Sequence, residues 1–64
     1  DAISMAQTAE GALRELSNII LRMRELSAQA SNGSLQSSDR DFIQTEFSNL
    51  QAETKRIIDS FAFL

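Results

Sequence analysis

The feature that most constrains this chain is a long series of mostly apolar residues at alternating steps of four and three. It is sustained for about four heptads, with no proline. Such spacing places side chains on one stripe of an α-helix and is typical of helices that pack side by side. The members are Ala2, Ala6, Ala9, Leu13, Leu16, Ile20, Met23, Ser27 and Ala30. The pattern predicts an amphipathic helix over about residues 2–32.

A second helix is predicted over about residues 38–62, because the same spacing returns there. Its stripe consists of Ile43, Phe47, Leu50, Thr54, Ile57, Phe61 and Leu64. Between the two stripes, residues 33–37 are rich in Gly and Ser, which favour turns. Asn32-Gly33 predicts the end of the first helix, with Gly33 left-handed. Asp1 is a candidate N-terminal cap of the first helix, and Ser38 or Ser37 of the second.

A short loop between two such helices favours an all-α, antiparallel two-helix hairpin resembling a coiled coil. The two stripes fit together in one register, which pairs Ser27 with Ile43, Ile20 with Leu50, Leu13 with Ile57, and Ala6 with Leu64. The predicted hairpin core therefore contains Leu13, Leu16, Ile20, Met23, Ile43, Phe47, Leu50, Ile57 and Phe61.

A further apolar series repeats every seven residues beside the first stripe. It consists of Met5, Ala12, Ile19 and Leu26. One partner helix cannot cover both series, and a chain of 64 residues has little core of its own. We therefore expect the isolated chain to self-associate, as a homo-oligomer, or to bind partner helices. Met5, Ile19, Leu26 and residues 61–64 would be covered in this way.

The composition argues against several function classes. The chain has no Cys and no His, which removes thiolate metal sites and the usual catalytic base. Its net charge of −3, with both signs scattered, argues against binding to nucleic acid. No apolar run approaches transmembrane length. The pattern starts in mid-repeat and ends in apolar residues, so we expect a fragment or an engineered piece. We expect no catalytic activity, no metal and no cofactor.

Three motifs occur in order and at consistent spacing. They are Gln7-Thr8-Ala9-Glu10-Gly11-Ala12-Leu13; the run Arg22-x-Arg24-Glu25-Leu26-x-x-Gln29-Ala30-x-Asn32-Gly33; and Ser38-Asp39-Arg40 followed by Ile43-Gln44-x-Glu46. Together they resemble bacterial flagellin, in the N-terminal part of the filament-core domain called D1. The resemblance covers about residues 1–56.

The resemblance implies a structural role and a set of partners. A flagellin segment would pack against other D1 helices and other flagellin subunits, in a secreted, extracellular filament used for motility. Flagellin is also a ligand of Toll-like receptor 5, an innate immune sensor. Carried over by motif, the residues that bind this receptor are Arg22, Leu26 and Glu46, and the predicted surface extends to Gln29 and Ile43.

Other interpretations remain open from the residues themselves. Arg22 and Glu46 can simply form an ion pair between helices, with Leu26 in a packing stripe. The whole chain can also be an unrelated or designed coiled coil that serves only for oligomerisation. A helix lying on a membrane surface is less favoured, because its polar face would be rich in Lys and Arg.

Overall fold

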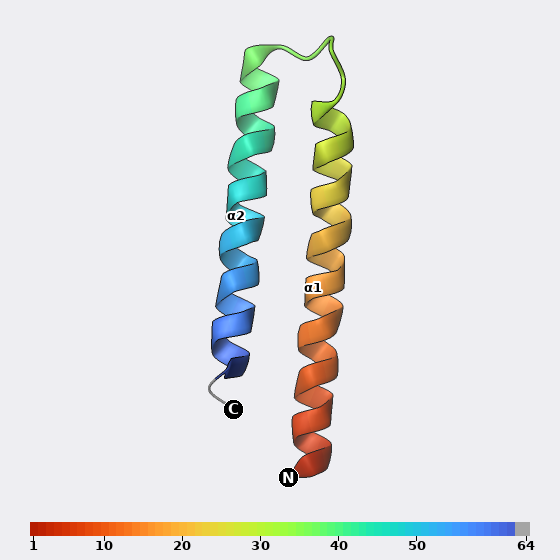
Figure 1. The fold of residues 1–64 in the computed structure, drawn as a ribbon, viewed down its shortest axis with the longest axis vertical. Coiled ribbons are helices and arrows are strands. Elements are labelled where there is room, and N and C mark those ends of the chain that lie inside the picture. The colour runs from red at the N-terminus through yellow and green to blue at the C-terminus, as the bar shows by residue number, and fades with distance from the viewer. Residues whose placement is uncertain (63–64) are drawn as a thin grey trace.

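The computed structural model describes residues 1–62 and contains two α-helices, α1 (Ala2–Ala30) and α2 (Ser37–Ala62). They run antiparallel, joined by a short loop (Figure 1). The predicted antiparallel hairpin is therefore confirmed. The first helix ends two residues earlier than expected. The expected pairing of Ala6 with Leu64 lies outside the described residues.

The N-terminal ends of both helices are capped by carboxylates. Asp1 accepts a hydrogen bond from the Ser4 backbone N–H at 2.9 Å, as the sequence predicts. In α2 the cap is Gln36, which precedes both predicted serines, Ser37 and Ser38. The Gln36 carbonyl accepts the first helical bonds, and the Gln36 N–H donates to Asp39 Oδ2 at 3.2 Å. Asp39 thus supplies the reciprocal bond of a capping box from the third helical position.

The end of α1 does not use a left-handed glycine. Gly33 has no positive φ, so that prediction is wrong. Instead, the Arg40 guanidinium reaches back from α2 and donates to the Ala30 carbonyl at 3.0 Å and the Asn32 carbonyl at 3.2 Å. The Ala30 carbonyl is one of those that a helix end leaves without an intrahelical partner. The Asn32 carbonyl lies just beyond the helix and also accepts from the Leu35 N–H at 3.3 Å. The Arg40 cation therefore binds both carbonyls and also interacts favourably with the negative end of the α1 dipole.

The hairpin core is centred on Ile19 and Leu26 of α1 and Ile57 of α2, which are the buried apolar side chains among the described residues. Leu26 is the most deeply buried, with only 1% of its surface exposed. The further apolar series of α1 therefore faces α2. The expectation that Ile19 and Leu26 need another chain to cover them is wrong.

The predicted core is correspondingly wrong at three positions. Leu13 is 63% exposed and Ile20 is 52% exposed, and Phe61 is exposed as well. Two arcs of α1 are apolar, and a single partner helix can cover only one of them. The remaining predicted members are at least partly buried: Leu16, Met23, Ile43, Phe47, Leu50 and Ile57.

The rotation of α1 also determines where Arg22 lies. Successive residues of an α-helix are turned by about 100°. With Leu26 at the centre of the contact, Arg22 lies on the flank of the seam and can reach α2. With Ile20 at the centre, Arg22 would point away from α2. The rotation that buries Leu26 is thus the one that permits the Arg22–Glu46 ion pair that the structure contains.

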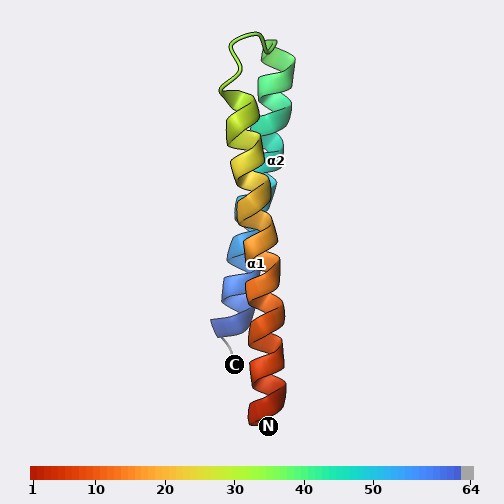
Figure 2. The same cartoon turned by 90° about the vertical axis from the view of Figure 1, so that its right-hand side faces the viewer.

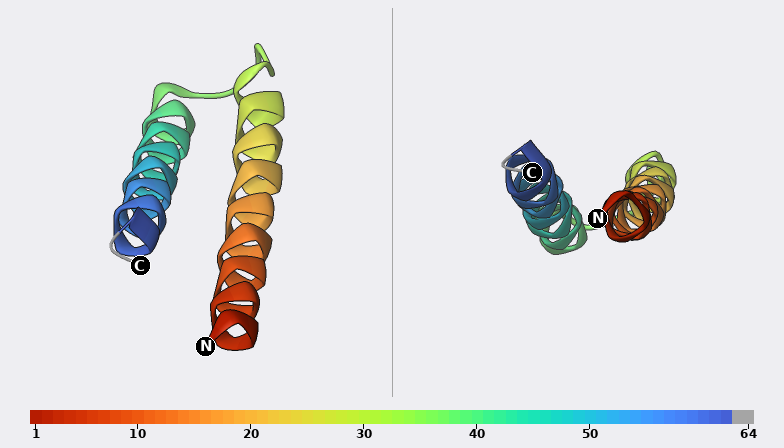
Figure 3. Two further views of the ribbon diagram at one scale, coloured as in Figure 1. Left: turned by 60° about the horizontal axis from the view of Figure 1, so that its bottom comes forward. Right: turned by 90° about the horizontal axis from the view of Figure 1, so that it is seen from below.

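The molecule is a thin, single-layered rod. It measures 52 × 16 × 10 Å, and its radius of gyration of 15.3 Å exceeds the value of about 11 Å for a compact domain of this length. The helices lie side by side along their lengths, and α1 extends beyond the described end of α2 (Figures 2 and 3). A single seam between two helices leaves every other helix face exposed to solvent.

Candidate interaction surface

The seam divides the hairpin surface into two faces of different chemistry. On α1, Thr8 and Glu15 lie to one side of Ala12, while Ala9 and Leu13 lie to the other, as the helical repeat requires. We call the side with Glu15 and Arg22 the polar face. The opposite side, which carries Leu13, Ile20 and Ile58, is called the apolar face. Each face is hollowed by grooves that run along the seam.

The apolar face contains a groove of about 320 Å³ near the open end of the hairpin. Nearly all its surface is hydrocarbon. Its lining residues come from both helices: Ala9, Ala12, Leu13, Leu16, Ile57, Ile58, Phe61 and Ala62. Leu13 and Ile58 are the lining side chains that are more than half exposed. Such a groove can accept large apolar side chains of another helix, but it has no group that could perform chemistry.

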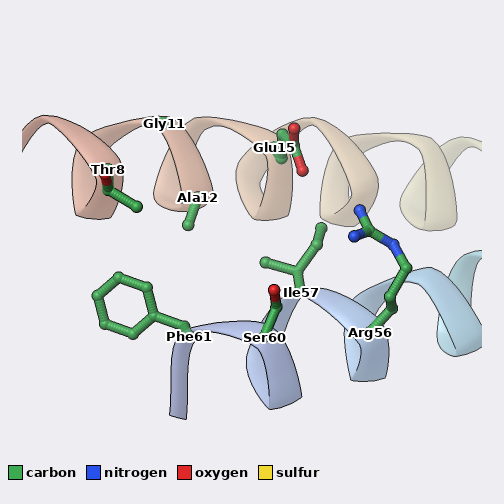
Figure 4. Close-up of a pocket in the computed structure, with 8 residues that line it drawn as sticks. All are labelled: Thr8, Gly11, Ala12, Glu15, Arg56, Ile57, Ser60 and Phe61. Carbon is green, nitrogen blue, oxygen red and sulfur yellow. The ribbon is translucent and has the colours of Figure 1, made fainter. Parts of the chain in front are cut away.

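The polar face has a groove of about 310 Å³ at the same end of the hairpin. Thr8, Gly11 and Glu15 line it from α1, and Arg56 and Ser60 line it from α2 (Figure 4). Ile57 points from α2 toward α1 at its base. A Cβ added at Gly11 would meet no atom within 4 Å, so close packing within this chain does not explain the glycine.

The strongest polar contact between the helices is the ion pair of Arg22 and Glu46. Arg22 Nε donates to Glu46 Oε1 at 2.7 Å, and Arg22 Nη2 donates to Oε2 at 3.1 Å. Arg22 Nη1 also donates to Glu25 at 3.0 Å. The two bonds to Glu46 form a planar fork that lysine could not reproduce. Both side chains remain partly exposed, so the pair is available to solvent or a partner.

The ion pairs of the polar face lower the pKa of two carboxylates, Glu46 and Glu53. The hydrogen bonds from Arg22 hold the pKa of Glu46 below its ordinary value of 4.5. Those from Arg56 do the same for the pKa of Glu53. Burial works in the opposite direction in both cases, but the hydrogen bonds are the larger effect.

These shifts predict the pH dependence of hairpin stability. A carboxylate whose pKa is lower in the folded state stabilises the fold above its unfolded pKa, and this contribution is lost as pH falls through the folded value. We therefore expect urea midpoints to be level above about pH 5.5 and to decline below pH 4.5, the ordinary glutamate pKa. In Glu46→Gln, the decline should be shallower. An equally steep decline in that variant would contradict this assignment.

The structure brings most of the predicted receptor-binding residues together. Arg22, Gln29 and Ile43 line one recess of about 260 Å³ on the polar face. Glu46 is bonded to Arg22 beside it. Leu26 differs, because it is buried between the helices, so in this hairpin it is not exposed for the direct receptor contact that the motif implied.

Sequence reasoning missed other residues of this recess. Phe42, Leu35 and Asp39 complete its lining, and Phe42 is 69% exposed. Phe42 precedes Ile43 and lies outside the predicted stripe of α2, which is why the heptad spacing did not identify it. An aromatic residue one position before a stripe residue, on the side of Glu46, was the available signal.

Residues 1–62 contain no cluster of three or more acidic, His or Cys side chains suited to a metal ion. Neither described helix combines the length and apolarity needed to cross a membrane.

Comparison with known proteins extends the resemblance seen in the sequence. The family model for the bacterial flagellin N-terminal helical region matches residues 1–63. Flagellin B of Vibrio anguillarum is 54% identical over 63 residues, covering 98% of this chain and 17% of its own. Flagellin C of Vibrio cholerae is 51% identical over the same shares. This chain thus spans about one sixth of the length of these relatives. No solved structure matches it.

Proposed function

Because this chain belongs to the bacterial flagellin family, as its N-terminal helical region, we propose that it is a structural segment of the flagellar filament subunit. Its role is to pack against other helices of the subunit and against neighbouring subunits. The place of action is the extracellular filament that drives motility. The segment performs no catalysis and needs no cofactor.

The observation that carries this proposal is the uncovered apolar face. Leu13, Ile20 and Ile58 are each more than half exposed, and Leu13 and Ile58 line a hydrocarbon groove between the helices. Covering the exposed half of each such side chain would contribute roughly 1–2 kcal/mol. The relatives are about six times longer than this chain, so most of their sequence is available to supply covering helices. In the isolated chain, the same face would favour a homo-oligomer.

A segment exchange tests this role. Residues 1–63 would replace the matching segment of Vibrio anguillarum flagellin B, expressed in a strain without other flagellins. We expect filaments in the electron microscope and swimming cells. A folded, secreted protein that forms no filaments would contradict the proposal.

A second function, recognition by Toll-like receptor 5, is supported by the recess beside the Arg22–Glu46 pair. Charged groups and an exposed aromatic ring meet there around a hollow of about 260 Å³. Arg and aromatic side chains are the residues that most often dominate protein interfaces. The proposed contacts are Arg22, Gln29, Ile43 and Glu46. Buried Leu26 would set the rotation of α1 that presents them.

Replacing Arg22 by alanine in full-length flagellin carrying this segment should weaken receptor binding about tenfold, because the planar fork is lost. Arg22→Lys should recover only part of the affinity. Arg14→Ala, on another part of α1, is the matched control. Surface plasmon resonance with the receptor ectodomain would measure these differences. Unchanged affinity in Arg22→Ala, with unchanged helix content, would reduce the pair to a structural ion pair.

A further inference from the structure

The loop between the helices contains an arrangement that the filament role does not use. Asn32, Gly33 and Ser34 are consecutive and exposed. The Ser34 backbone N–H donates to Asn32 Oδ1 at 3.0 Å, and the Ser34 hydroxyl donates to the same oxygen at 2.7 Å. One side-chain amide oxygen thus receives two hydrogen bonds from the same residue.

From this geometry we propose that Asn32 is a site of spontaneous deamidation, promoted by Ser34. The backbone nitrogen of Gly33 attacks Cγ of Asn32 and loses its proton. The side-chain amide leaves as ammonia, and a five-membered succinimide remains. Water then opens the ring at either carbonyl, which yields aspartate or isoaspartate. Water is the only co-reactant, and no oxidation or reduction occurs.

Ser34 acts on the atom where negative charge develops. When nitrogen attacks Cγ, the Asn32 Oδ1 becomes an oxyanion in the tetrahedral intermediate. Two donors already aimed at that oxygen stabilise this charge, as the donors of an oxyanion hole do. In addition, the same bonds polarise the Cγ carbonyl before attack. Ser34 is therefore a positioning residue that acts through Asn32.

The nucleophile is also accessible. Within residues 1–62, the Gly33 N–H donates no hydrogen bond, so no bond must break before it reacts. Gly33 has no side chain to hinder the approach, and a Cβ built there meets nothing within 4 Å. By contrast, Asn18 and Asn49 lie inside α1 and α2, where the next residues are Ile19 and Leu50. Helical hydrogen bonds restrain both of those sites.

The modification would alter the anchor of the loop. The Asn32 carbonyl accepts hydrogen bonds from Arg40 at 3.2 Å and from the Leu35 N–H at 3.3 Å. Isoaspartate lengthens the backbone at residue 32 by one carbon. This weakens the hydrogen bonds that Arg40 and the Leu35 N–H donate there. The seam around Leu26 lies outside the loop, so the hairpin would keep its helices.

Incubation of the 64-residue chain at mildly alkaline pH tests the assignment, with peptide mass spectrometry and chromatographic separation of the aspartyl and isoaspartyl products. Asn32 should be converted at least about tenfold faster than Asn18 and Asn49, which are internal references. Ser34→Ala should slow conversion of Asn32 about fivefold, the effect expected from losing one hydrogen bond. Gly33→Ala, for which the fold has room, should slow it further.

Two controls separate chemistry from folding. Circular dichroism should show unchanged helix content in both variants. In denaturing urea, where Ser34 is no longer held beside Asn32, the difference between Ser34→Ala and the unaltered chain should vanish. Conversion of Asn32 no faster than that of Asn18 would overturn the site. A folded Ser34→Ala chain that reacts as fast as the unaltered one would overturn the role of Ser34.

Discussion

Replacing Leu26 by alanine is expected to unfold most of the isolated hairpin. Leu26 is 1% exposed and lies at the centre of the seam. Removing such a side chain costs about 3 kcal/mol, from lost burial and the cavity left behind. A chain of this length rarely has more than about 3–5 kcal/mol of stability from its core. The loss of helical circular dichroism and the urea midpoint would measure the effect.

Leu21→Ala is the matched control for this change. It removes the same atoms from the same helix, but Leu21 is more than half exposed. Its effect should stay within about 0.5 kcal/mol. If Leu21→Ala and Leu26→Ala destabilised the chain equally, or if Ile20→Ala were the more damaging change, the rotation of α1 described above would be wrong.

The second large effect concerns filament assembly. In full-length flagellin carrying this segment, Leu13→Gln combined with Ile20→Gln should abolish filaments and swimming. Both side chains belong to the apolar face, and each change should remove roughly 1–2 kcal/mol of the stabilisation gained when that face is covered. The defect would be repeated in every subunit. Electron microscopy of shed filaments and motility in soft agar would measure it.

The same double change should leave the isolated hairpin folded, because Leu13 and Ile20 are exposed in it. Arg14→Gln, an exposed polar position between them in sequence, should leave filaments intact. Normal filaments from the Leu13→Gln, Ile20→Gln protein would show that the apolar face is not an assembly surface.

The fold could be predicted because helical periodicity is a local property. The apolar spacing around Leu16 and around Leu50, with Gly and Ser between, identified both helices and their antiparallel pairing. The rotation of α1 could not be predicted in the same way. Ile19 and Ile20 belong to adjacent series with the same seven-residue repeat, so spacing alone does not select between them. A contact distant in sequence, Arg22 with Glu46, accompanies the observed choice.

The helix ends also differ in whether they could be predicted from local sequence. Asp1 was identifiable as a cap, because its partner is only three residues away. The end of α1 was not, because the decisive group is Arg40 of the next helix. In the candidate surface, Arg22 and Glu46 were found by motif. Phe42 was missed because its place beside Leu35 and Gln29 depends on how the loop folds back.

Thiol labelling tests most directly whether the apolar face is covered in the assembled protein. This segment contains no cysteine, so Ile20→Cys gives it one reporter thiol. In the isolated hairpin at low concentration, this thiol should react about as fast as a free peptide thiol. In full-length flagellin filaments carrying the segment, it should be strongly protected. Equal reactivity in the hairpin and in the filament would contradict the proposed role of this face.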